Sequence, residues 1–247
     1  MKSFVKLVYV SLKLYLREPI TVFFTLGFPV MLVLIFGAMF GNQPTPLFGG
    51  YGSMDISMPG YAALILGSVG MLTVAINTSS YREAGILRRF RATPLPPFIY
   101  ILADVVTNLI MTLLGMVGVV LVGKLLYRVR FEGNVFSVLL AVILGGLAMS
   151  AVGYLIASLA PSARTAQVIG MVLFYPMLFL SGAGYPPELL PATMRRIADF
   201  LPLTYVARLL RGLWFGDSWR EHWAEAAVLA AIVMVGTALA ARLFRWE

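Results

Sequence analysis

Residues 135–160 read VFSVLLAVILGGLAMSAVGYLIASLA, an unbroken apolar run that contains no charged side chain. A helix needs about 20 predominantly apolar residues to cross the hydrocarbon core of a bilayer. The run does not alternate between apolar and polar residues, as the strands of a membrane β-barrel do. It therefore predicts a membrane-spanning α-helix.

Five further runs of similar character flank this one. The chain is 60% hydrophobic and 12% charged, with a mean hydropathy of +0.88, whereas soluble domains carry about 25% charged residues. The sequence predicts an all-α integral membrane protein whose residues 1–247 form a single domain. The six predicted spans are 20–41, 58–80, 98–126, 135–160, 165–182 and 224–244.

The charge and the cysteine count narrow the function classes. The chain has no cysteine, which excludes disulfides, thiolate chemistry and cysteine zinc sites. Its net charge of +8 is typical of a membrane protein whose cytoplasmic loops are basic, and we expect no nucleic-acid partner. With both termini inside, basic residues number eleven on the inner side and eight on the outer, which favours this orientation.

The amino-terminal residues 3–18 are too charged to span a bilayer. On a helical wheel, Lys2, Lys6, Lys13 and Arg17 fall on one narrow face, and apolar residues fill most of the remainder. This pattern predicts an amphipathic helix in the membrane interface. Simple anchoring explains the pattern, and so does a role in docking a partner or lining an entry to a pathway.

A short charged stretch separates the second and third predicted spans. Residues 81–97 read YREAGILRRFRATPLPP, and three prolines stop any helix by Thr93. A loop that only fixes orientation explains the arginines. It does not explain the apolar face formed by Ile86, Leu87 and Phe90, which favours insertion of a helix over 82–92 into a groove of another protein.

This stretch resembles the coupling region of ABC exporter permeases of the second type. The matching positions are Arg82, Glu83, Gly85, Leu87, Arg88, Arg89, Thr93, Pro94 and Leu95, while Ile86 stands where threonine is common. A second stretch after the fifth span is similar to the same family, through Leu180, Ser181, Gly182, Pro202, Leu203, Thr204, Tyr205, Arg211, Gly212 and Leu213.

The resemblance implies a permease without its own ATPase site, in the cytoplasmic membrane of a prokaryote. Two copies of a cytoplasmic ABC ATPase would hold the ATP and magnesium, and a second permease subunit, identical or paralogous, would pair with this chain. The expected ATPase contacts are Arg82, Glu83, Gly85, Ile86, Leu87, Arg88, Arg89 and Phe90. The nearest match to a phosphate-binding loop, GVVLVGK at 118–124, lacks the following hydroxyl residue and lies within an apolar span.

Residues 187–215 are too charged for one span and too apolar for a free loop. They predict two short helices that break at Pro202 and turn back into the outer leaflet. The family resemblance implies that such helices cap the outer end of a pathway. The expected outer gate is Leu180, Ser181, Gly182, Pro202, Leu203, Tyr205 and Arg211.

Several polar residues interrupt the spans, and polar groups inside a membrane usually face protein or water. We expect Asn77, Asp104 and Asn108 to line a pathway, and Asp104 either pairs with Arg164 or stands apart from it. Small residues, among them Gly70 and Gly153, predict close helix contacts.

The best-supported function is the transmembrane subunit of an exporter that moves a drug, antibiotic, lipid or lipid-linked glycan by alternating access. The alternatives are a membrane enzyme that acts on lipid and a secondary transporter. A membrane enzyme would need a catalytic cluster, and the sequence shows none. A secondary transporter would show inverted repeats and buried coupling charges, and the sequence shows neither.

Overall fold

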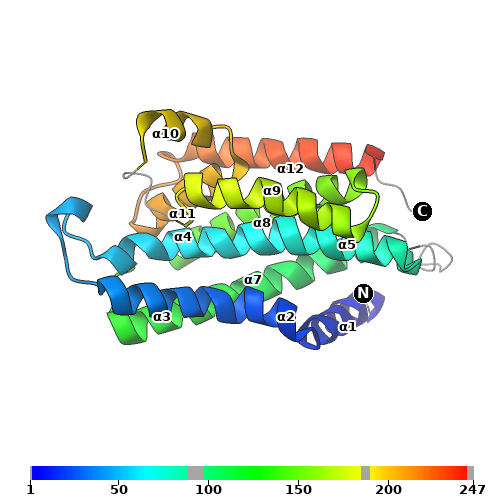
Figure 1. The fold of residues 1–247 in the computed structure, drawn as a ribbon, viewed down its shortest axis with the longest axis horizontal. Coiled ribbons are helices and arrows are strands. Elements are labelled where there is room, and N and C mark those ends of the chain that lie inside the picture. The colour runs from blue at the N-terminus through cyan, green and yellow to red at the C-terminus, as the bar shows by residue number, and fades with distance from the viewer. Residues whose placement is uncertain (1, 88–96, 185–189, 244–247) are drawn as a thin grey trace.

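The computed structural model describes residues 2–87, 97–184 and 190–243, and within these ranges the regular elements are helical. Figure 1 shows the long helices running along the longest axis of the molecule. The elements are α1 (Lys2–Leu16), α2 (Pro19–Val22), the π-helical η1 (Phe23–Gly27), α3 (Phe28–Phe40), the 3₁₀-helical η2 (Pro46–Phe48), α4 (Ser53–Gly67), the π-helical η3 (Ser68–Thr73), α5 (Val74–Glu83), α7 (Pro97–Tyr127), α8 (Val135–Leu159), α9 (Ala163–Leu180), α10 (Ala192–Ala198), α11 (Pro202–Trp214) and α12 (Trp223–Leu243).

Six of the described segments are long and apolar enough to cross a membrane, which confirms the predicted fold class. They are Phe23–Phe40, Ser53–Glu83, Ile101–Tyr127, Val135–Leu159, Ala163–Leu180 and Trp223–Leu243. The predicted helix 82–92 lies partly outside the described residues, and the part described places Arg82 and Glu83 in the last turn of α5. The described part of the predicted segment 187–215 holds α10 and α11, and α11 begins at Pro202.

The two ends of the bundle differ. One end, which we call the terminal end, holds α1, the end of α5, the turn 160–162 between α8 and α9, and the last turn of α12 (Figure 1). The opposite end, which we call the capped end, holds η2, α10 and the loops 41–52, 128–134 and 181–184 (Figure 1).

The continuous helix Ser53–Glu83 forms the centre of the bundle. In its most apolar stretch 78% of the residues are buried, against 22% for Phe23–Phe40 and 17% for Trp223–Leu243. It contacts α3, α7, α8, α9 and α11 along its length. The outer helices therefore present apolar surfaces outward, as a protein in lipid requires.

Glycines set the crossing of the central helix and α8. A Cβ on Gly153 would lie 2.3 Å from the carbonyl oxygen of Gly70, and a Cβ on Gly70 would lie 2.6 Å from the Cβ of Met149. Any larger residue at either position would push the two backbones apart. The crossing lies at η3, a π-helical segment of the kind that marks a local adjustment inside longer helices.

Candidate functional site

A pair of charged residues joins the end of α5 to the corner between α8 and α9. Arg82 donates hydrogen bonds to the carbonyl oxygens of Ala157, at 2.9 Å, and Ala160. Glu83 accepts one from the backbone N–H of Ala163 at 3.1 Å. The last carbonyls of a helix and its first N–H groups lack partners within the helix, and they carry opposite partial charges. The arginine thus caps α8, the glutamate caps α9, and we call this arrangement the corner clamp.

The remaining predicted ATPase contacts divide into three groups. Gly85 has φ +66° and breaks the helix after Ala84, a conformation that glycine adopts readily. Ile86 lines a cavity within this chain. Leu87 is completely buried among other residues of the same chain. Arg88, Arg89 and Phe90 lie outside the described residues.

The structure brings the three predicted pathway residues together in one cavity at the terminal end. Asn77 from α5 and Asp104 and Asn108 from α7 line a space of about 140 Å³ beneath α1. The polar residues of α7 meet there because positions three and four apart share a helix face. The other lining residues are Leu7, Val10, Ser11, Leu14, Tyr15, Glu18, Tyr81, Ile86 and Thr107. We call this space the terminal cavity.

Neutral groups hold the Asp104 carboxylate. The Tyr154 hydroxyl donates to its Oδ2 at 2.6 Å, and Asn108 Nδ2 donates to the same oxygen at 3.2 Å. Arg164, a partner considered from the sequence, is exposed. Sequence reasoning missed Tyr154, although Ser150, Tyr154 and Ser158 recur every four residues on α8 and so share one face.

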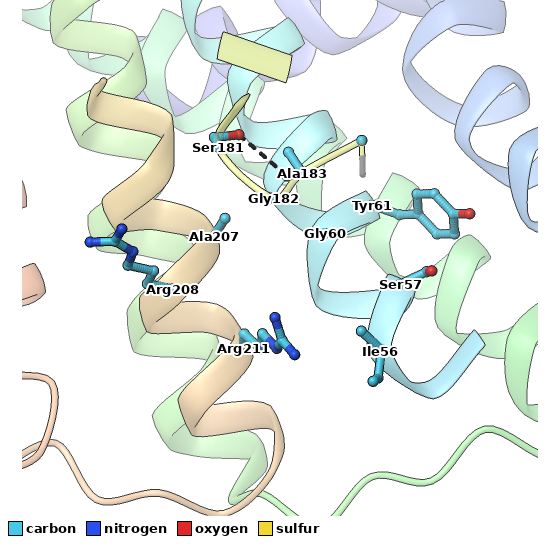
Figure 2. A pocket seen from close by; sticks show the side chains of 11 residues that line it. Ile56, Ser57, Gly60, Tyr61, Ser181, Gly182, Ala183, Ala207, Arg208 and Arg211 are labelled. Atoms are coloured by element: carbon cyan, nitrogen blue, oxygen red, sulfur yellow. Dashed lines mark hydrogen bonds between the residues drawn. The ribbon is translucent and has the colours of Figure 1, made fainter. Parts of the chain in front are cut away.

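A second, smaller pocket lies at the capped end between α4, α11 and the turn after α9. It measures about 50 Å³, and its walls include Ser181, Gly182 and Arg211, three of the predicted gate residues. Figure 2 shows Arg211 extending from α11 toward α4, with the turn 181–183 above. A Cβ on Gly60 would lie 2.9 Å from the carbonyl oxygens of both Gly182 and Ala183, so the backbones of α4 and the turn are in close contact at one wall of this pocket.

The other predicted gate residues do not line this pocket, which we call the capped pocket. Leu180 ends α9, and Pro202 begins α11. Leu203 is completely buried, 3.1 Å from the position that a Cβ on Gly67 would occupy. The Tyr205 hydroxyl donates to the carbonyl oxygen of Asp199 at 2.6 Å and so ties α11 to the end of α10.

A buried carboxylate that sequence reasoning missed organises the loops of the capped end. Asp55 Oδ1 accepts hydrogen bonds from Asn42 Nδ2 at 3.0 Å and from the Arg130 N–H at 2.9 Å. Its Oδ2 accepts from the Gly52 N–H at 3.0 Å. Asn42 Oδ1 in turn accepts from the N–H groups of Met54 and Asp55, both at 3.1 Å. These bonds, which we call the Asp55 hub, join the loops 41–52 and 128–134 to the first turn of α4.

The sequence that resembled a phosphate-binding loop is helical. Gly118 and Lys124 both lie within α7, whose residues run without a break from Pro97 to Tyr127. A phosphate-binding loop needs several N–H groups free to point at the phosphates, and a helix interior has already used them.

Comparison with known proteins gives consistent matches. The ABC-2 type transporter family model matches residues 2–215. The chain is 28% identical over 225 residues to the daunorubicin resistance ABC transporter permease protein DrrB1 of Streptomyces coeruleorubidus, covering 88% of this chain and 77% of that protein.

Two relatives from Escherichia coli K12 are more distant. The inner membrane transport permease YhhJ is 23% identical, covering 73% of this chain and 50% of YhhJ. The probable multidrug ABC transporter permease YbhR is 22% identical, covering 70% of this chain and 48% of YbhR. This chain thus spans about half the length of these two relatives. With six membrane-length helices and a family match over nearly all its residues, the chain belongs to the ABC-2 type transporter family, whose members are transmembrane permease subunits without an ATPase site of their own.

Proposed function

We propose that this chain is the membrane-spanning subunit of an exporter that moves an amphiphilic substrate, such as a drug, antibiotic, lipid or lipid-linked glycan. The names of DrrB1 and YbhR favour drugs within this range, and the name of YhhJ favours the inner membrane of a prokaryote. The terminal end would face the cytoplasm, so both termini would lie inside.

In this proposal the energy comes from other subunits. Two copies of an ABC ATPase bind ATP and magnesium on the cytoplasmic side, and a second permease, identical or paralogous, completes the membrane pathway. The ATPase contact would involve the exposed Glu83 and Ala84 together with Arg88, Arg89 and Phe90.

The observation that carries the proposal is the corner clamp. It lies directly before the segment that we assign to the ATPase, and its two side chains grip the end of α8 and the start of α9. A movement imposed on residues 84–90 would therefore act on two spanning helices at once. ATP binding can shift the equilibrium between two conformations only if it favours one of them. The clamp would transmit that preference from the ATPase contact to α8 and α9.

The capped end would supply the other half of an alternating-access cycle. At the pocket there, the backbones of Gly60 and the turn 182–183 are in close contact, while the terminal cavity has the larger volume of the two. In the proposed orientation this conformation is open toward the cytoplasm. Export requires α4 and the turn after α9 to separate while the terminal cavity contracts.

Reconstitution with the ATPase tests the proposal. The permease and its ATPase should copurify and, in proteoliposomes, show ATP-dependent transport and substrate-stimulated ATP hydrolysis, with daunorubicin as the first compound tried. Dependence on a proton or sodium gradient in place of ATP would support a secondary transporter and overturn the proposal. Lipid turnover without transport would support a membrane enzyme and overturn it too.

Two variants locate the joint between the subunits. We expect Arg89→Glu to weaken copurification with the ATPase, and Glu83→Ala to retain the ATPase but lose substrate stimulation. Glu221→Ala, at the capped end, serves as the matched control and should behave as the wild type. Unchanged binding and stimulation in both Arg89→Glu and Glu83→Ala would refute the assigned joint.

A further inference from the structure

The terminal cavity has an unusual charge. The whole chain contains 19 basic and 11 acidic residues, yet the described residues that line this cavity include two acids, Asp104 and Glu18, and no lysine or arginine. Among the amino-terminal basic residues whose side chains the structure describes, Lys6, Lys13 and Arg17 are exposed and do not line it. The described part of the lining is therefore negative, within a positively charged protein.

The hydrogen bonds of Asp104 do not neutralise it. Its two described donors, Tyr154 and Asn108, are uncharged, and both bind the same oxygen, Oδ2. A carboxylate removed from water is unfavourable unless a cation, strong hydrogen bonds or a proton compensates it. Asp104 lines open volume, so a cation from outside the chain has room to approach it.

The walls favour an organic cation with an apolar tail. Tyr15 and Tyr81 contribute aromatic rings, which attract ammonium groups more readily than they attract strongly hydrated metal ions. Val10 and Leu14 are exposed apolar residues that also line the cavity, so apolar surface continues from its interior to the outside of α1. Glu18, exposed and hydrogen-bonded by Thr21 at 3.1 Å, lies four positions beyond Leu14.

The volume of the terminal cavity limits the size of the ligand group that it can enclose. Pockets that enclose a whole drug-sized molecule measure about 300–1,000 Å³, and the terminal cavity measures about 140 Å³. It can hold a headgroup with a few carbon atoms, while the rest of an amphiphile stays against the apolar side of α1 and the surrounding lipid.

We propose that the terminal cavity binds the ammonium headgroup of a cationic amphiphile, with Asp104 as the charge partner, so that the exporter prefers cationic over neutral and anionic substrates. This selectivity builds on the proposed transport function, but the binding step needs neither ATP nor the ATPase. Asn77, Asn108 and Ser11 provide hydrogen-bonding groups around the headgroup, and Glu18 adds a second negative charge.

A matched pair of probes tests the proposal by equilibrium binding. Radiolabelled dodecylamine and dodecanol share a chain and differ in the charged headgroup. The full chain in phosphatidylcholine nanodiscs, without ATP, should bind dodecylamine about tenfold or more tightly than dodecanol after subtraction of empty nanodiscs. Equal binding of the two probes by the wild type would overturn the proposal whatever any variant does.

The decisive variant is Asp104→Asn. An asparagine of the same shape can keep an oxygen toward Tyr154 and Asn108, so we expect a folded protein that has lost its preference for dodecylamine. Asp104→Glu should retain the preference, and the surface variant Glu221→Gln should match the wild type. A preference that persists in Asp104→Asn would overturn the assignment, because the charge would then come from elsewhere.

The binding experiment and the transport experiment can fail independently of each other. If dodecylamine binds selectively but no compound stimulates the ATPase, the site is real and the transport proposal fails. If transport is driven by ATP but neither Asp104→Asn nor headgroup charge affects binding, the transport proposal stands and the cationic site is refuted.

Discussion

The terminal cavity and the capped pocket lie at opposite ends of one bundle and are built in opposite ways. Side chains from α1, α5, α7 and the turns beside them line the terminal cavity, whose described residues include acids and no base. The described residues of the capped pocket include Arg208 and Arg211 and no acid, and its walls are made partly of the backbone of Gly60 and residues 181–184. Arg208 is paired with Asp199 at 2.5 Å, whereas Asp104 has only neutral described partners.

The two pockets also differ in volume. The terminal cavity measures about 140 Å³ and the capped pocket about 50 Å³. Side chains can change rotamer around a ligand, but a contact between Gly60 and two carbonyl oxygens opens only when α4 and the turn move apart. The terminal cavity is thus suited to accept a ligand, and the contact beside the capped pocket to resist its passage until helices shift.

The largest effect is expected at the capped end, from Asp55→Ala. The variant removes a carboxylate that accepts three hydrogen bonds and leaves the N–H groups of Gly52 and Arg130 without their acceptor. Each hydrogen bond to a charged group contributes about 1.5–3 kcal/mol, so we expect a loss of at least about 3 kcal/mol of unfolding free energy. Thermal unfolding followed by tryptophan fluorescence in detergent measures it.

Asp217→Ala is the control for this experiment, because it removes from the same end an exposed carboxylate whose described side-chain contact is with His222, at 3.0 Å. It should leave the unfolding temperature close to that of the wild type. If Asp55→Ala unfolds at the wild-type temperature, the Asp55 hub does not hold the capped end shut, and the contrast between the two ends loses its structural basis.

An intermediate effect is expected at the terminal end, from Arg82→Ala. The variant leaves the carbonyl oxygens of Ala157 and Ala160 without the guanidinium that caps α8, which should cost about 1.5–3 kcal/mol. Coupling should suffer more than stability, because the clamp joins α5 to α8. We expect nearly normal ATPase binding with loss of substrate-stimulated hydrolysis.

Arg164→Ala, which removes an exposed arginine near the same corner, is the matched control and should keep both properties. Wild-type stimulation in Arg82→Ala would show that the corner clamp is only structural. The proposed route from the ATPase to α8 would then be wrong, even though the subunits still assemble.

The sequence predicted the parts of both ends that depend on local pattern. Long uncharged runs can satisfy their backbone groups in lipid only as helices, so all six membrane-length segments were predicted. Asp104 and Asn108 were predicted to share a pathway because polar residues interrupt an otherwise apolar α7 and so face inward. Short-range periodicity was sufficient for these features.

The features that were missed depend on contacts between distant residues. Tyr154 reaches Asp104 from 50 positions away, and Arg130 reaches Asp55 from 75 positions away. Such pairs depend on the order of helices around the bundle, which periodicity within one helix does not specify. The second span begins at Ser53 and not at 58, because Asn42 accepts hydrogen bonds from the N–H groups of Met54 and Asp55.

The smallest effect is expected from Tyr15→Phe, which tests how α1 is held over the terminal cavity. The Tyr15 and Thr25 hydroxyls share a hydrogen bond of 2.7 Å that ties α1 to η1, and its loss should cost about 1 kcal/mol. Burial raises the pKa of Tyr15 above its ordinary value, since the charged form is poorly solvated there. The neutral hydroxyl therefore stabilises the folded state below about pH 10, and this contribution disappears as the pH rises through the folded-state pKa.

Unfolding temperatures of the wild type and Tyr15→Phe measured from pH 7 to pH 11 separate these effects. The wild type should lose stability at the alkaline limit more steeply than the variant, so the two curves should converge there. Tyr9→Phe removes an exposed hydroxyl from the same helix and should follow the wild type throughout. If the Tyr15→Phe curve runs parallel to the wild type over the whole range, the pKa of Tyr15 is the same in the folded and unfolded states, and burial beneath α1 does not shift it. That result would sharpen the comparison with the capped pocket, since water would then reach Tyr15 through the terminal cavity, and the terminal cavity would differ in its solvation as well as in the charge of its described walls.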